Sequence, residues 1–156
     1  MPPRPDRVRL TSTNGAHWLE VAQLRPPGAA GKPRRDASGD FWGSVTLHTP
    51  DDHIRAHVGW LSAYQDMFGD YLREIATAET WDGEKMHRTE DDDLILRIGI
   101  SETGAASVAA RVLDWWDPYH PAQGGYQYRR ELEARFDVDR EELTRFASDL
   151  AELLAV

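Results

Sequence analysis

Two histidines with a spacing suited to metal binding are the first residues in this chain that suggest chemistry. His53 and His57 lie four positions apart, and on a helix that spacing places both imidazoles on one face. Imidazole is a common zinc ligand, and His48 or Asp52 is near enough in sequence to supply a third ligand. The segment lacks the His-Glu-x-x-His pattern of zinc hydrolases, so we expect polar residues at a helix start, with no metal and no cofactor.

A second set, Asp114, Asp117 and His120, has the residue types of general acid–base catalysis. Paired carboxylates beside aromatic residues are typical of glycoside hydrolases, although nothing in the sequence fixes their geometry here. The chain has no glycine-rich phosphate loop and no nucleophile-elbow motif. A small-ligand-binding or hydrolytic enzyme that uses His53 and His57, or the 114–120 segment, stays open as an alternative.

The same segment also suits recognition of a protein. Trp115 and Trp116 are adjacent, so on a strand they point to opposite faces, and one of them faces the solvated side of the sheet. Tryptophan is enriched at protein interfaces, and carboxylates flank this pair. An acidic run at 90–93 adds further exposed charge and lacks the alternating ligands of a calcium loop. The residues we predict to bind a partner are Asp91, Asp92, Asp93, Asp114, Trp116 and Asp117.

The elements that would position these residues follow from hydrophobic periodicity. Alternating patterns predict strands near residues 8–10, 17–24 and 41–49, with Asn14-Gly15 as a hairpin turn between the first two. Thr49 followed by a proline and two aspartates is typical of a helix start, and the spacing of later apolar residues predicts a long helix over Thr49–Thr80.

In the second half of the chain, alternating patterns predict strands at 85–89, 94–100, 106–112 and 126–138. The spacing of apolar residues then predicts a helix over Glu141–Ala155. In that helix Asp139 is the expected cap and Glu142 its capping-box partner. The fold class is therefore α+β: a bent antiparallel sheet of six to seven strands, with the long helix across one face and the C-terminal helix closing the core. The expected core comprises Trp18, Phe41, Val45, Leu61, Phe68, Leu72, Leu96, Ile98, Val108, Val112, Leu132, Phe136, Phe146 and Leu150.

Composition and charge limit the classes of function. We expect one domain over residues 1–156, with a loose tail at 1–6 and a flexible basic loop at 25–39. There are no cysteines, and no long apolar run or apolar leader is present, so we expect a cytoplasmic protein without disulfides and no membrane partner. Residues 1–35 hold seven basic and two acidic side chains. The remainder of the chain holds eleven basic and twenty-five acidic side chains. Such an acidic body argues against nucleic acid as a partner.

From Asp40 onward the chain places Phe41-Trp42-Gly43 in a strand, Phe68 and Leu72 in a helix, and Trp81-Asp82-Gly83 after that helix. An acidic turn then precedes Leu94-Ile95-Leu96, and Leu143 and Phe146 lie in the last helix. With these residues the order of elements resembles the WapI-type immunity proteins of bacterial polymorphic toxin systems and related bacterial domains of unknown function. The chain departs from the family in its 25–39 loop and in the 115–118 segment.

The resemblance implies a cytoplasmic inhibitor that binds a toxin and performs no reaction of its own. Because the body of the chain is acidic, we expect its partner to be a protein such as a basic toxin domain, whose cationic surface meets the carboxylates. A homo-oligomeric module, such as a homodimer that pairs through the aromatic strand, is the remaining alternative.

Overall fold

The structure, a computed structural model, describes residues 6–23, 43–58, 65–79, 81–89, 94–101, 103–115 and 128–154. Its elements follow the chain in the order β1 (Arg7–Thr11), β2 (Trp18–Gln23), β3 (Gly43–His48), β4 (His53–Val58), α1 (Gln65–Thr77), β5 (Glu84–Arg88), β6 (Leu94–Ile100), β7 (Ala106–Trp115), β8 (Tyr128–Val138) and α2 (Arg140–Leu154).

The strands form two antiparallel sheets of four strands each, β1-β2-β3-β4 and β5-β6-β7-β8. Every neighbouring pair is consecutive in the chain, as expected for antiparallel meanders that need no crossover. The α+β class and the antiparallel pairing are therefore confirmed, whereas the single sheet of six to seven strands is wrong. Each sheet has one apolar face, and packing the two faces together removes both from water.

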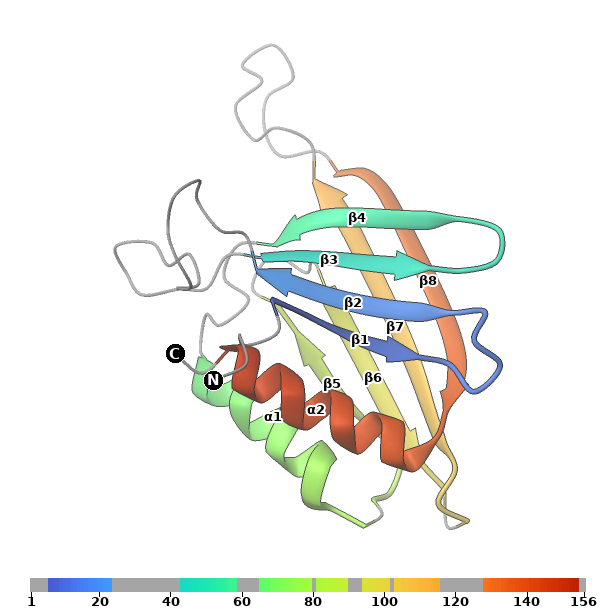
Figure 1. Ribbon diagram of the computed structural model, residues 1–156, viewed down its shortest axis with the longest axis vertical. Coiled ribbons are helices and arrows are strands. Elements are labelled where there is room, and N and C mark those ends of the chain that lie inside the picture. Colours follow the sequence, from blue (N-terminus) through green and yellow to red (C-terminus); the bar gives the residue numbers. More distant parts are fainter. Residues whose placement is uncertain are drawn as a thin grey trace.

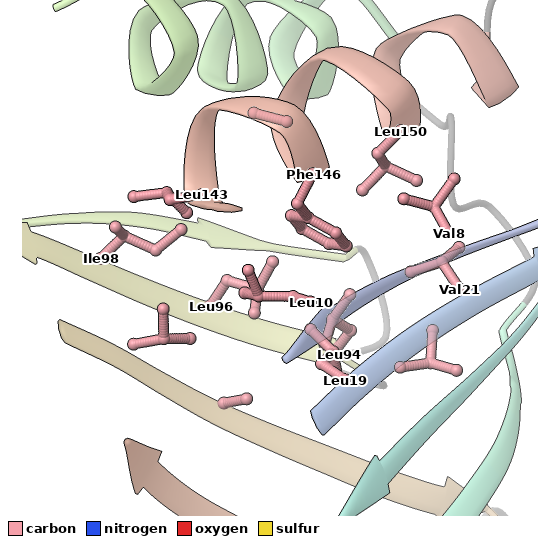
Figure 2. Close-up of a cluster of buried hydrophobic side chains, with 14 of the residues drawn as sticks. Val8, Leu10, Leu19, Val21, Leu94, Leu96, Ile98, Leu143, Phe146 and Leu150 are labelled. Carbon is pink, nitrogen blue, oxygen red and sulfur yellow. The ribbon is translucent and has the colours of Figure 1, made fainter. Parts of the chain in front are cut away.

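Sheet β5–β8 forms one layer of the molecule, and sheet β1–β4 and the two helices lie side by side against it (Figure 1). Strands β3 and β4 pack over β7 and β8, while α2 packs against β1 and α1. One continuous cluster of buried side chains draws on both sheets and both helices. Figure 2 shows its centre, where Phe146 and Leu150 of α2 meet side chains from β1, β2 and β6.

The long helix Thr49–Thr80 is also wrong, because its first ten residues form a turn and strand β4, and α1 covers Gln65–Thr77. Thr49 Oγ1 accepts a hydrogen bond from the backbone N–H of Asp52 at 3.0 Å, which is the contact a helix cap makes. The same residues also favour a β-turn with proline in its second position. After the turn, Ile54 and Ala56 are buried and alternate with exposed neighbours, a period of two.

The predicted C-terminal strand and helix, and the buried stripe of that helix, are confirmed. Strand β8 and helix α2 lie within a residue or two of the expected bounds, and Leu143, Phe146 and Leu150 are fully buried. The expected capping-box residue has a different partner, because Glu142 Oε1 accepts a hydrogen bond from the backbone N–H of Thr11 at 3.2 Å. Glu142 therefore ties α2 to strand β1.

Most of the predicted core is buried where the structure describes it, with two exceptions, Trp18 and Leu132. Trp18 lies outside the buried cluster, on the outer face of sheet β1–β4, because the buried residues Leu19 and Val21 occupy the inner face of β2. Leu132 is partly buried against the cluster. The positions of Phe41 and Leu61 and the side chain of Phe68 lie outside the described part of the chain.

Helix α1 packs on β5 through Tyr71, whose ring lies 5.4 Å from that of His87 and whose hydroxyl donates to the carbonyl of Lys85. In the described segments, no helix is long and apolar enough to cross a membrane.

Burial lowers the pKa of His87 to about 4, and this predicts a loss of stability in mild acid. Between pH 6.5 and 4 the unfolded chain binds a proton at this imidazole that the folded chain does not, so the free energy of unfolding falls as pH falls. Because the ring is partly exposed, solvent screens part of this effect, and we expect the free energy of unfolding to fall by about 2 kcal/mol over this window. Urea unfolding of the wild type and of His87→Phe at pH 7 and pH 4.5 measures it; equal losses in the two proteins would exclude His87 as the cause.

Candidate functional site

The outer face of sheet β1–β4 carries two rows of polar and aromatic side chains that run across the strands. The strand register aligns Arg9, Glu20, Thr46 and Arg55 in one row. It aligns Thr11, Trp18, His48 and His53 in the next row. Neither described helix lies over this face (Figure 1).

Stacking contacts join side chains of the two rows. We call this stack the ladder; it consists of Arg9, Trp18, His48 and His53. The guanidinium carbon of Arg9 lies 3.8 Å from the centre of the Trp18 ring. On the next strand the His48 ring stacks on Trp18 at 4.9 Å, nearly parallel at 11°, and His53 follows at 6.4 Å from His48. Cation–aromatic and ring-stacking contacts of this kind favour one fixed arrangement of the side chains.

Arginines outnumber carboxylates within the two rows of this face, which we call the ladder face. Glu20 is the carboxylate within the two rows, its side chain is 12% exposed, and Arg9 donates to it at 2.9 Å. Arg7 approaches the same carboxylate at 3.8 Å and the carboxylate of Asp6, just before β1, at 3.5 Å. Arg55 is exposed and makes no hydrogen bond or ion pair with any residue in the described ranges. The acidic net charge of the chain is therefore not the charge that this face presents.

The structure does not support the metal site considered for His53 and His57. These residues lie on strand β4, where four positions span about 13 Å, so the two backbones are too far apart for the paired-ligand geometry of a helix. The side chain of His57 lies outside the described part. His48 and His53 stack on each other, and the described residues contain no group of three or more side chains suited to a metal ion.

Of the predicted partner-binding residues, Asp114 is the one whose side chain the structure describes. It lies at the end of β7, opposite Arg130 of β8, beside a register shift between residues 114 and 115. Asp91, Asp92, Asp93, Trp116 and Asp117 lie outside the described residues, so the predicted acidic surface stays a prediction. The same holds for His120 and the acid–base set.

Arg130 also joins the two sheets. Its guanidinium lies 2.5 Å from the Asp52 carboxylate in the β3–β4 turn. This hydrogen bond is the main reason that the pKa of Asp52 is held below its ordinary value of 3.8. The turn that precedes His53 is therefore attached to strand β8.

A hollow of about 360 Å³ lies where the β1–β2 hairpin meets β8. It is lined by Ser12, His17 and Asp137 among others, the residue types of a hydrolytic triad. However, Ser12 Oγ donates its proton to Asn14 Oδ1 at 2.7 Å, and it accepts from the backbone N–H of His17 at 3.0 Å. The hydroxyl therefore holds the hairpin together, and its proton is not directed to the imidazole as a nucleophile's would be.

The sequence pattern does not reveal the ladder, because it favours other roles for the same residues. Periodicity predicts Trp18 in the core, and spacing suggests His48 and His53 as metal ligands. The signal that could have found them is the polar side of each short strand: Arg7 and Arg9, then Trp18 and Glu20, then Thr46 and His48 alternate with apolar neighbours. Residues on such a side share one solvent-facing surface once the strands pair.

A search for similar proteins found no matching family model, no matching curated protein and no matching solved structure.

Proposed function

We propose that this chain is a non-enzymatic binding protein that holds a protein partner on the ladder face. The observation that carries the proposal is the stack of Arg9, Trp18 and His48 on an outer sheet face that neither described helix covers. Arginine and tryptophan are the residues that most often dominate binding energy at protein interfaces. Because these side chains are already stacked, less rotamer freedom is lost when a partner covers them.

The sequence resemblance gives this proposal a specific form. A WapI-type immunity protein would act in the cytoplasm and would neutralise a toxin by covering it. The ladder face then becomes the surface that meets the toxin. The earlier expectation, a basic toxin domain held by Asp114 and its acidic neighbours, uses a different surface and can be tested separately.

The absence of cysteine in the chain allows a test that does not depend on the charge of the partner. Arg55→Cys places a single thiol on the ladder face, and Arg97→Cys places one on the outer face of sheet β5–β8. The two arginines are matched, since both are exposed on strands and neither pairs with another described residue. Each variant is coupled to a bulky maleimide and used to capture the partner from native lysate.

We expect the label at position 55 to lower recovery of the partner at least about tenfold, because a bulky group on the face excludes contact. The label at position 97 should leave recovery unchanged. Equal recovery with both labels, or a loss confined to position 97, would contradict the proposal. Recovery of this chain alone would instead support the homo-oligomeric alternative.

A further inference from the structure

We infer that the partner meets the ladder face with an acidic protein segment, which is the opposite charge to that of the expected basic toxin. The inference rests on the proposed function and adds the chemistry of the partner. It follows from where the cations lie and from which of their donors are already used.

The row Arg9–Glu20–Thr46–Arg55 has a cation at each end. The single carboxylate between them, Glu20, is approached by both Arg9 and Arg7, so arginines outnumber carboxylates here and Arg55 carries a positive charge that no described carboxylate balances. Asp52, at the neighbouring turn, is bound to Arg130. The Arg55 guanidinium keeps all its N–H donors for an incoming group, as far as the described residues show.

The spacing of the row suggests how such a segment would lie. Arg9 and Arg55 are three strands apart, which corresponds to about 14 Å at a strand separation of about 4.8 Å. An extended peptide advances about 3.3 Å per residue, so carboxylates about four residues apart would reach both guanidinium groups. Arginine binds carboxylates through paired N–H donors, which favours Asp and Glu as the contacting residues.

Nucleic acid is also anionic, but two observations favour an acidic protein. Bases bind single-strand sites by stacking on open aromatic faces, whereas the Trp18 ring is stacked by Arg9 and by His48. The chain carries a net charge of −9, which repels a long polyanion more than it repels a short acidic segment.

The inference is tested by nuclear magnetic resonance on the full, isotope-labelled chain with three probes at one low ionic strength. The probes are a 12-residue peptide with glutamate at every fourth position, the same peptide with lysine, and a 12-nucleotide thymidine strand. We expect the acidic peptide alone to shift the Trp18 indole signal and the amide signals of Arg9, His53 and Arg55 in a saturable way. Arg55→Glu should weaken this binding about tenfold, and the matched variant Arg97→Glu should not.

Tighter binding of the lysine peptide or of the thymidine strand at the ladder face would overturn the inference. Its failure is distinct from failure of the proposed function. If the label at position 55 blocks capture of the natural partner while Arg55→Glu strengthens that capture, the ladder face is the interface and its partner is basic. If the label has no effect on capture, the proposed function itself fails.

Discussion

Replacing Trp18 with alanine is expected to weaken binding of the partner by about 30-fold or more, equivalent to about 2 kcal/mol. The indole is the centre of the ladder, with Arg9 on one side at 3.8 Å and His48 on the other at 4.9 Å. Its removal takes away contact area and also the support that fixes both neighbours. Isothermal titration of the captured and purified partner against wild type and Trp18→Ala measures the effect.

Trp18→Phe is the matched control, because it keeps an aromatic ring between Arg9 and His48. We expect this variant to retain most of the affinity. Circular dichroism and urea unfolding of both variants separate loss of binding from loss of the fold. Wild-type affinity in a folded Trp18→Ala protein would show that the ladder is not the centre of the interface.

Replacing Phe146 with alanine is expected to lower the free energy of unfolding by about 3–5 kcal/mol. The side chain is 1% exposed and points from α2 toward Leu10 of β1 and Leu96 of β6, where both sheets and the helix share one core (Figure 2). A cavity at this junction removes packing contacts from both sheets and from α2. For a domain whose total stability is on the order of 5–15 kcal/mol, this is a large fraction. Urea unfolding followed by far-ultraviolet circular dichroism measures it.

Ser148→Ala, on the exposed side of the same helix, is the control and should change stability by less than about 0.5 kcal/mol. A loss of less than about 1 kcal/mol for Phe146→Ala would mean that α2 does not share its core with the two sheets.

The second half of the fold could be predicted because each of its elements repeats one period over many residues. Strand β8 alternates over 11 residues, and α2 keeps Leu143, Phe146 and Leu150 on one stripe over 15. The region after residue 49 could not be predicted in this way. Its turn residues are equally suited to a helix cap and to a β-turn, and Ile54 and Val58 are four apart, which fits a helix as well as a strand.

The division into two sheets could not be predicted from the sequence for a different reason. Periodicity indicates which face of a strand is buried, but it does not indicate what covers that face. The contacts that join the sheets come from residues far apart in the chain, such as Asp52 with Arg130 and the backbone N–H of Thr13 with the carbonyl of Asp137.

The candidate site was less accessible to sequence reasoning than the fold. Segment 114–121 is an unusual local sequence, whereas the ladder is assembled from ordinary residues of four separate strands. Its character depends on pairing register, since a shift of one residue would turn Trp18 inward and Leu19 outward. Net charge was equally uninformative, because an acidic chain presents arginines on this face.

The central claim, that the partner covers the ladder face, is tested most directly by hydroxyl-radical footprinting of the complex. Trp18 and His53 report on the ladder face, and Met86, which is 50% exposed on the outer face of sheet β5–β8, reports on the opposite side. We predict that partner binding slows oxidation of Trp18 and His53 and leaves Met86 unchanged. Protection of Met86, with Trp18 and His53 oxidised as in the free protein, would contradict the claim.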